Sequence, residues 1–178
     1  PPGAIKPGFV GTPIEGVRLK IIDDDEKELP LGAEGEICVA GDNIMKGYWN
    51  KPAETRAAFT ADGWLKTGDV GLIDADGYLS IRDRKKDMII IKGLKVFSAQ
   101  GEAVIAENPS IEESAIVGVP DETGDETIKA FVVLKKGCRL EKPALFQFFK
   151  EKLDAYKRPR DVEIVEALPK NALQKVLK

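Results

Sequence analysis

Histidine is absent from the 178 residues of this chain, and cysteine occurs only twice. Without histidine, the chain cannot form a His-dependent catalytic triad, use imidazole as a general acid or base, or build a His metal site. The two cysteines, Cys38 and Cys138, are too far apart in sequence for a metal-ligand pair, and we interpret both as small apolar residues. Any chemistry must therefore use Lys, Arg, Asp, Glu or the backbone.

Three kinds of segment are also missing from the sequence. No run approaches the roughly 18 apolar residues of a membrane span, and the first residues lack the basic and apolar regions of a signal peptide. We therefore expect a cytoplasmic protein without a transmembrane segment. Nor does any Gly/Ser/Thr-rich stretch with a lysine occur, the kind of loop whose N–H groups wrap a triphosphate.

The composition is that of an ordinary globular protein, with 43% hydrophobic and 32% charged residues, and the length permits one domain or two small ones. Charge is uneven, because residues 135–178 hold twelve Lys or Arg against six Asp or Glu. Such a basic segment could bind a polyphosphate, although a solvated surface is the commoner explanation of a basic segment. We expect no nucleic-acid partner.

The first half of the chain is typical of short strands joined by turns. The alternation of apolar and basic residues from Val17 predicts a strand with one buried face, and the acidic run 23–27 predicts a solvated hairpin loop. Pro52 fits the first position of a helix that we expect to end near Phe59. Further strands are expected at 36–40, 64–66, 70–74 and 78–82. This pattern predicts a small antiparallel β-barrel or sandwich.

After Lys86 the pattern changes to helices mixed with strands. We expect a hairpin of strands 88–91 and 94–97, and a helix capped by Ser98 that ends near Asn108. Further along the chain we expect strands at 111–119, 128–134 and 162–165, a polar loop at 121–126 and a helix at 143–153. The fold class is therefore α+β, with a β subdomain followed by a compact α/β domain that has a mixed sheet and helices.

One short motif can place an acid at a strand end. In Thr67-Gly68-Asp69 the glycine permits a backbone turn, which would present the Asp69 carboxylate after the strand 64–66. A carboxylate there can accept both hydrogen bonds of a vicinal diol. Arg84 follows inside a charged run, 82–87, that we interpret as a connector. Taken alone, so short a motif is far more often just a turn with a solvated Asp, and a salt bridge between strand ends stays open as the alternative for the pair of Asp69 and Arg84.

These motifs, in order with Asp-Gly-Tyr-Leu between them and Ile-Ile-Ile-Lys-Gly-Leu-Lys-Val after them, resemble the acyl-adenylate-forming superfamily over essentially the whole chain. That superfamily includes acyl-CoA synthetases, luciferases and the adenylation domains of peptide synthetases. The sequence Asp-Arg-Lys-Lys-Asp-Met-Ile-Ile at residues 83–90 is similar to the corresponding motif of the fatty acyl-CoA ligases. The resemblance implies that residues 1–84 are the end of the large AMP-binding domain and residues 85–178 the mobile C-terminal domain.

The resemblance also implies roles for single residues. Asp69 and Arg84 would hold the ribose of ATP and of the acyl-adenylate, and Ile81 would lie against the adenine. Lys175 would reach the α-phosphate during adenylation, and Lys86 would be the hinge. Gly93 would let the pantetheine arm of CoA pass, although a simple hairpin turn would equally explain this glycine.

Two positions depart from the family pattern. Gln174 stands where relatives usually have a glycine before the lysine. In Ser98-Ala99-Gln100-Gly101-Glu102, relatives commonly have a proline and a first glutamate, and Gly101 disfavours the start of a helix. The chain begins at Pro1 and ends in what resembles the opening of a further helix, so we expect a piece of a longer protein.

The sequence therefore predicts part of an ATP-dependent, AMP-forming acyl-CoA ligase that acts on a carboxylic acid, most simply a fatty acid, with CoA as acceptor. Magnesium is implied by ATP, with its ligand and the phosphate loop in an upstream domain of the same protein. The alternatives are an adenylating enzyme that does not use CoA, of the peptide-synthetase or luciferase kind, and a non-catalytic binding module of the same ancestry.

Overall fold

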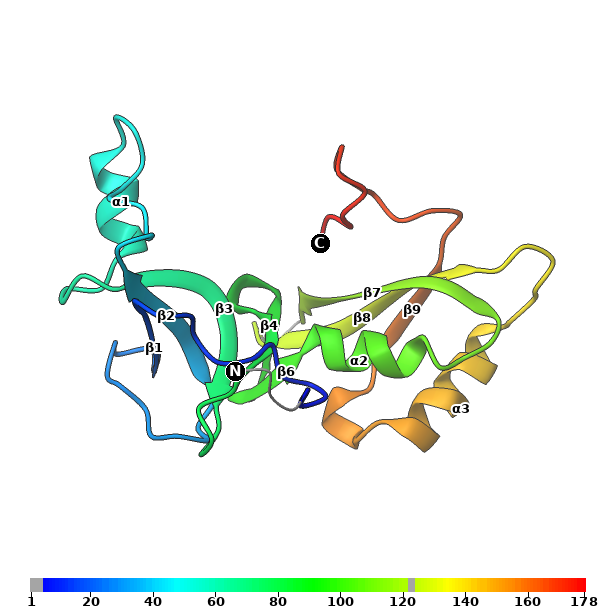
Figure 1. The fold of residues 1–178 in the computed structure, drawn as a ribbon. Coiled ribbons are helices and arrows are strands. Elements are labelled where there is room, and N and C mark those ends of the chain that lie inside the picture. Colours follow the sequence, from blue (N-terminus) through cyan, green and yellow to red (C-terminus); the bar gives the residue numbers. More distant parts are fainter. Residues whose placement is uncertain (1–4, 122–123) are drawn as a thin grey trace. The chain divides into compact units, whose positions relative to one another are not determined.

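The computed structural model describes residues 5–121 and 124–178 and confirms the α+β class. The chain folds into two compact units, Pro1–Lys86 and Asp87–Lys178. Figure 1 labels the elements of both units. In the first unit these are β1 (Val17–Ile22), β2 (Gly35–Gly41), α1 (Pro52–Ala58), β3 (Leu65–Ile73) and β4 (Leu79–Arg84). In the second unit they are β5 (Met88–Ile91), β6 (Leu94–Phe97), α2 (Ser98–Ile105), β7 (Ile111–Pro120), β8 (Glu126–Leu134), α3 (Lys142–Lys152) and β9 (Asp161–Ile164).

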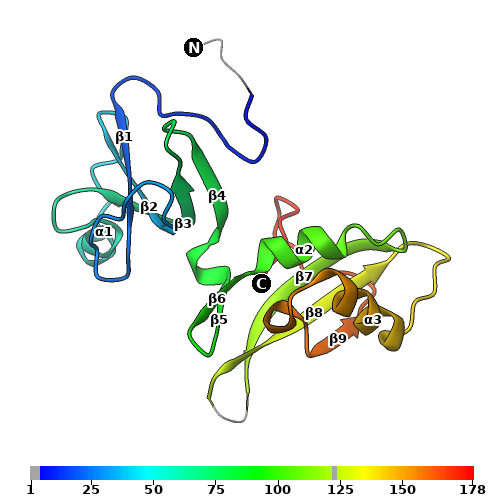
Figure 2. The ribbon, with the colours of Figure 1, turned by 90° about the horizontal axis from the view of Figure 1, so that it is seen from below.

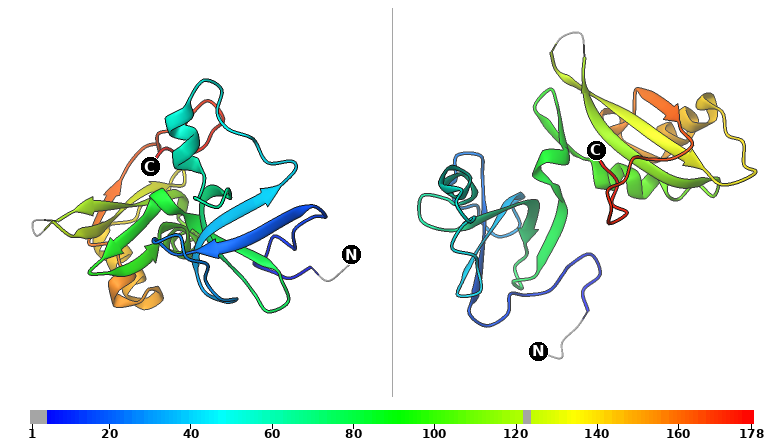
Figure 3. Two further views of the ribbon diagram at one scale, coloured as in Figure 1. Left: turned by 90° about the vertical axis from the view of Figure 1, so that its left-hand side faces the viewer. Right: turned by 90° about the horizontal axis from the view of Figure 1, so that it is seen from above.

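The first unit is built on an open antiparallel sheet in the order β1-β2-β3-β4. Strands β1 and β2 run side by side as two blue arrows in the left view of Figure 3. Of the two predicted alternatives, a barrel or a sandwich, the barrel is wrong, because among the described residues β1 and β4 do not pair with each other and remain the two edges of the sheet.

The strand β3 is continuous where we expected two strands separated by a turn. It absorbs the extra residues in a bulge instead of breaking. Between the pairs Glu36↔Val70 and Cys38↔Lys66, the single residue Ile37 of β2 faces three residues of β3. A bulge of this kind interrupts the ladder locally and redirects side chains without ending the strand.

A 3-10 helix, Lys85–Asp87, follows β4 and spans the boundary between the two units. The hairpin β5–β6 begins directly after it and is confirmed as predicted. Its two-residue turn has positive φ at both Lys92 (48°) and Gly93 (80°), which is the backbone of a type I′ turn.

The second unit has a three-stranded mixed sheet, in which β8 pairs antiparallel with β7 and parallel with β9. Helices α2 and α3 lie on one face of this sheet, and the C-terminal tail, drawn in red, lies on the other (Figure 1). Figure 2, seen from below, places both helices in front of the strands, whereas the right view of Figure 3 places them behind.

Strand periodicity explains these two covered faces. On β8, Ile128, Ala130 and Val132 belong to the larger core with the helices, whereas Phe131 and Val133 belong to a smaller cluster with the tail. Successive side chains of a strand point to opposite faces, so an uninterrupted apolar run is buried on both sides only if both sides are covered.

Helix α2 begins at Ser98 itself, and not after it as we predicted, because Phe97 occupies the N-cap position. The helix also ends at Ile105, earlier than predicted. Gly101 does not interrupt it. Gly101 is buried in α2, and a Cβ placed there would lie 2.4 Å from Cδ1 of Ile116 on β7. The glycine therefore permits close packing of helix on sheet, which outweighs its low helix propensity.

The tail does not open a helix. Lys170 and Val176 form an isolated antiparallel bridge, so this segment turns back on itself. Part of the expected polar loop at 121–126, residues 122–123, lies outside the described residues. Among the residues described, none of the helices combines the length and apolar character needed to cross a bilayer.

Candidate functional site

The bulge in β3 forms around Thr67, a residue that we did not single out from the sequence. The Thr67 hydroxyl donates a hydrogen bond to the carbonyl oxygen of Ile37 (2.8 Å) and accepts one from the N–H of Asp69 (3.1 Å). Gly68 between them has φ 72°. A Thr that bonds to the backbone two residues later is a recognised turn signal, so Thr67 was the one local signal of this geometry, although we predicted a break of the strand here and not a bulge. The bulge fixes the backbone of Asp69.

The structure brings Asp69 and Arg84 together. They face each other in the β3–β4 ladder, and Arg84 Nε lies 2.8 Å from Asp69 Oδ1. A Cβ on Gly68 would lie 3.9 Å from Nη2 of Arg84, so the guanidinium extends beside the bulge. Both side chains are partly exposed, 31% for Asp69 and 45% for Arg84. A surface pair of this kind stabilises a fold by about 0–1 kcal/mol, so stability alone gives little reason for it.

Ile81 reaches the same side of the sheet through a second bulge. The pairs Val70↔Asp83 and Gly71↔Ile81 leave Arg82 as an extra residue on β4. In consequence the buried residues of this strand are Ser80 and Asp83, three apart, and the exposed ones are Ile81 (48%) and Arg84. The unbroken alternation of a strand would have put Ile81 and Arg84 on opposite faces.

Beside this pair, β4 carries a second ion pair of closely similar geometry. Arg82 Nε donates a hydrogen bond to Glu34 Oε1 over 2.9 Å, and both side chains are partly exposed. The two arginines thus differ in their position relative to the bulge of β3, while their Nε–carboxylate pairing is nearly the same. Arg82 therefore provides a matched comparison for Arg84.

The predicted hinge residue Lys86 lies in the middle of the 3-10 helix, immediately before the division between the units. Its neighbour Lys85 is fixed to the first unit, because Lys85 Nζ lies 2.8 Å from Oε2 of the buried Glu36 and 3.2 Å from Oδ1 of Asp24. The hydrogen bond to Glu36 raises the pKa of Lys85 above its ordinary value, although partial burial acts in the opposite direction. Lys85 is therefore a charged anchor on the first unit.

The other two predicted site residues belong to the second unit. Gly93 is the second residue of the β5–β6 turn, and apart from its two chain neighbours no described residue has an atom within 4 Å of where its Cβ would be. Positive φ is by itself a sufficient reason for glycine at this position. Lys175 is exposed in the tail, at a different place in this unit from the β5–β6 turn.

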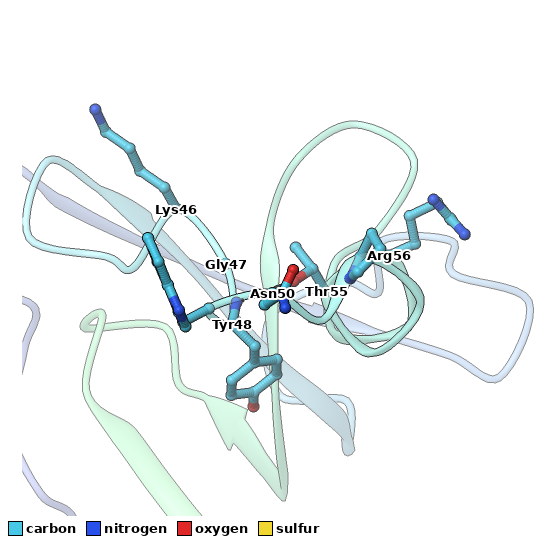
Figure 4. A pocket seen from close by; sticks show the side chains of 8 residues that line it. Lys46, Gly47, Tyr48, Asn50, Thr55 and Arg56 are labelled. Carbon is cyan, nitrogen blue, oxygen red and sulfur yellow. Dashed lines mark hydrogen bonds between the residues drawn. The ribbon is translucent and has the colours of Figure 1, made fainter.

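Among the hollows on the surface of the described residues are two that we did not expect from the sequence. One, of about 530 Å³, lies in the first unit between residues 46–50 and the start of α1 (Figure 4). Lys46 and Arg56 point away from each other on its two sides, and Trp49, which also lines it, is 95% exposed. The other, of about 410 Å³, lies beside the β5–β6 turn and is lined by Ile91, Lys92, Asp121, Asp125, Glu126, Thr127 and Arg160.

The two cysteines have different environments. Cys38 is buried in β2, and this burial raises the pKa of its thiol to about 11. Cys138, which we also interpreted as a small apolar residue, is exposed in the loop between β8 and α3. Within residues 5–121 and 124–178, no three His, Cys, Asp or Glu side chains gather closely enough to hold a metal ion.

Two family models match the chain. Residues 1–49 match the model of the AMP-binding enzyme, and residues 100–175 match that of the AMP-binding enzyme C-terminal domain. The two matches lie in the same order as the two units, one on each side of the boundary at Lys86.

Curated proteins and solved structures agree with these matches. The chain is 44% identical to a long-chain-fatty-acid–CoA ligase of Bacillus subtilis over 99% of its own length and 31% of that protein. It is 40% identical to the fatty acid–[acyl-carrier-protein] ligase ScoC of Streptomyces coeruleorubidus, over 100% of this chain and 35% of that protein. Among solved structures, ATP-bound MatB from Rhodopseudomonas palustris superimposes with a TM-score of 0.90 at 38% identity, covering 98% of this chain and 35% of that one. The chain thus spans about a third of the length of the relatives it matches.

Proposed function

The chain belongs to the AMP-binding enzyme family, and from this membership we propose that it is part of an ATP-dependent, AMP-forming ligase that joins a carboxylic acid to a thiol. Residues 1–84 would complete the large nucleotide-binding domain, and residues 85–178 would form the mobile C-terminal domain. The upstream part of the same protein would supply the phosphate loop and the acid pocket. Several curated relatives are named as ligases of long-chain fatty acids, so a fatty acid is the proposed substrate class.

One observation carries the proposal. Asp69 and Arg84, fifteen residues apart in sequence, meet over 2.8 Å at a bulge, with Ile81 on the same exposed side of β4. The Asp69 carboxylate can accept hydrogen bonds from the 2′ and 3′ hydroxyls of a ribose, while the Arg84 guanidinium donates to a ribose oxygen. Ile81 offers an apolar surface for the adenine. Contacts on two sides of the ribose would fix the position of the nucleotide. Positioning of this kind can supply a large part of the rate enhancement.

In the proposed first step, a carboxylate oxygen of the acid attacks the α-phosphorus of ATP, and the bond from that phosphorus to the bridging oxygen of pyrophosphate breaks. Negative charge grows on the phosphoryl oxygens, and we assign its stabilisation to the Lys175 ammonium. Magnesium would accompany ATP and shield the phosphates. We assign it no ligand in this chain.

In the proposed second step, the thiol sulfur attacks the acyl carbonyl carbon, the bond to AMP breaks and the thiol proton is lost. We propose that the C-terminal domain turns about Lys86 between the two steps, so that the β5–β6 turn with Gly93 replaces Lys175 at the nucleotide. Such a turn requires large dihedral changes in only a few residues. The Lys85–Glu36 pair supports a pivot after Lys85, because it ties that residue to the first unit.

The acceptor can differ from CoA. One relative at 40% identity is named as a ligase that uses an acyl-carrier protein, which favours carrier-bound thiol as a second candidate. Both acceptors end in a thiol, so both fit the same second step.

The test is acid-dependent exchange of labelled pyrophosphate into ATP by the complete enzyme, followed by supply of CoA or acyl-carrier protein. We expect exchange with fatty acids and thioester formation with one acceptor. The 178-residue chain alone should fold and show no exchange, because its sequence has no phosphate loop. Absence of acid-dependent exchange in the complete enzyme would favour a non-catalytic module, and robust exchange by the 178-residue chain would overturn the domain assignment.

A further inference from the structure

The C-terminal tail forms a short hairpin, and contacts with the rest of the second unit fix the residues before and after it. At its start, Leu168 is buried against Ala115 and Val133 on the sheet face opposite the helices. At its end, Lys178 Nζ lies 2.7 Å from Glu102 Oε1 and donates a hydrogen bond to Ser98 Oγ over 2.7 Å, both on α2. The segment between these anchors is therefore part of the folded second unit.

The hairpin itself is closed by backbone contacts. Lys170 and Val176 form the antiparallel bridge, and the N–H of Leu177 donates to the carbonyl oxygen of Pro169 over 2.8 Å. Val176 also packs against the cluster that contains Leu168. Residues 171–175 form the tip of this hairpin.

A single residue, Asn171, organises the tip. Its side-chain Oδ1 accepts hydrogen bonds from the N–H groups of Leu173 and Lys175, each over 3.0 Å. Its backbone N–H donates to the carbonyl oxygen of Lys175 (2.9 Å), and its own carbonyl accepts from the N–H of Gln174 (2.9 Å). Both backbone polar groups of Lys175 are thus bonded to Asn171. An Asn that bonds to the backbone two and four residues later is a strong turn-forming arrangement.

The tail contains two paired lysines and one lysine whose ammonium has no ion-pair partner among the described residues. Lys170 pairs with Glu113 and Lys178 with Glu102, whereas Lys175, between them, is exposed at the tip. The backbone of Lys175 is therefore fixed while its charge remains available to a ligand.

We propose that Asn171 is a positioning residue for Lys175 in adenylate formation. This proposal rests on the proposed function above, and in particular on the role of Lys175. A lysine on a mobile tail would lose chain entropy each time it reached a phosphate, whereas a lysine on a closed tip loses only side-chain freedom. Because charge stabilisation depends on preorganised geometry, loosening the tip should lower the rate of the step that uses Lys175.

The structural half of the test uses the 178-residue chain and measures amide hydrogen exchange. Asn171→Ala should lower the protection of the Leu173 and Lys175 amides by roughly five-fold or more, the effect of losing about one hydrogen bond. Asn171→Ser should restore part of it, since a serine hydroxyl makes the same turn more weakly. The matched control is Asn108→Ala, which removes a single bond of the same kind to the N–H of Ser110 and should leave the tip unchanged. Unchanged protection in Asn171→Ala would overturn the proposal.

The functional half uses the complete enzyme. Asn171→Ala should reduce kcat for adenylate formation by about ten-fold or more, with little change in KM for ATP and none in thioester formation from supplied acyl-adenylate. Asn171→Ser should recover part of the rate. In a Lys175→Ala background, Asn171→Ala should cause no further loss, because residues that act through one another are not additive.

The outcomes separate the two proposals. If Asn171→Ala lowered the rate of adenylate formation equally in the presence and absence of Lys175, Asn171 would act only through stability. If Asn171→Ala lowered amide protection but left that rate unchanged, positioning of Lys175 would not be needed. Either result overturns the positioning role and leaves the proposed function in place. If Lys175→Ala itself left adenylate formation unchanged, the catalytic role of Lys175 would fail and the positioning role with it.

Discussion

At the scale of single residues, the environment of each thiol decides its reactivity. The pKa of Cys38 is raised to about 11, mainly because its burial disfavours the thiolate, whereas Cys138 is exposed. At pH 8 a thiol reagent should modify Cys138 and leave Cys38 unmodified until the chain unfolds, because the thiolate is the reactive form. Mass spectrometry of the labelled chain, with Cys138→Ser as the control that abolishes fast labelling, measures this. Fast modification of folded Cys38 would contradict its burial.

The same buried thiol, Cys38, makes stability depend on alkaline pH. Between about pH 9 and 11 the folded chain keeps the Cys38 proton that the unfolded chain has lost, so the folded state binds more protons and stability falls as pH rises. The free energy of unfolding, measured by urea at several pH values, should therefore fall more steeply through this window in the natural chain than in Cys38→Ala. Parallel slopes for the two chains would show that Cys38 does not titrate in this way.

Gln174 is a further residue whose conformation matters. Its φ is 62°, a left-handed conformation that glycine adopts without the cost that other residues incur. This explains why a glycine fits here and why Gln174 carries strain in the closed tip. Gln174→Gly should make the tip more stable by about 0.5–1 kcal/mol, since relief of strain exceeds the added chain entropy.

Hydrogen exchange at the Lys175 amide measures this effect. Ala172→Gly, in the same tip but without positive φ, is the control and should reduce protection. Equal effects of Gln174→Gly and Ala172→Gly would mean that the left-handed conformation at Gln174 does not store strain.

At the scale of elements, the contact between α2 and β7 depends on Gly101. A Cβ there would lie 2.4 Å from Cδ1 of the buried Ile116. Gly101→Ala should therefore destabilise the second unit by about 1–3 kcal/mol, as overpacking does, in spite of a gain in helix propensity of about 1 kcal/mol. Adding Ile116→Val removes the clashing methyl and should recover stability relative to Gly101→Ala alone. Urea unfolding of the two single variants and the double variant measures the coupling, and additive losses would contradict the close contact.

The elements were predictable wherever local pattern and tertiary context agree. Alternation predicted β1, Pro52 and Pro143 marked the first turns of α1 and α3, and the Lys92-Gly93 turn marked the β5–β6 hairpin. Prediction failed where a tertiary contact overrides the local signal. The bulge around Thr67 needs the carbonyl of Ile37, and Gly101 in α2 needs the proximity of Ile116.

The candidate site was predictable to a similar degree. The sequence indicated Asp69, Arg84 and Ile81, and the structure places the first two in contact. The exposure of Ile81 beside Arg84 depends on an extra residue in β4, and no periodicity rule anticipates such a bulge. Asn171 was missed because its bonds close a turn in a segment that was expected to be helical.

At the scale of the whole molecule, the proposed turn about Lys86 is testable by restricting one residue. Proline fixes φ near −65° and also restricts the preceding residue, here Lys85. In the complete enzyme, Lys86→Pro should let pyrophosphate exchange continue if the fixed geometry suits adenylation, while thioester formation from supplied adenylate falls by an order of magnitude or more. Lys86→Ala, which keeps the backbone free, is the control.

Single-turnover thioester formation beside a melting curve measures the effect of Lys86→Pro. The melting temperature should change little, because Lys86 lies in a short connector and not in the core of the second unit. An unchanged thioester rate in the folded variant would show that the enzyme pivots elsewhere or does not pivot.

The central claim is that the bulge in β3 and the end of β4 hold the ribose of ATP, and a comparison of two arginines tests it most directly. Arg84 and Arg82 lie two residues apart on β4, pair with carboxylates over 2.8 and 2.9 Å, and are both partly exposed. The measurement is acid-dependent pyrophosphate exchange by the complete enzyme. Arg84→Ala should lower kcat/KM for ATP by about ten-fold to a hundred-fold, since a charged donor to the sugar is lost, whereas Arg82→Ala should retain the natural rate. Equal rates for the two variants, with both folded, would contradict the claim.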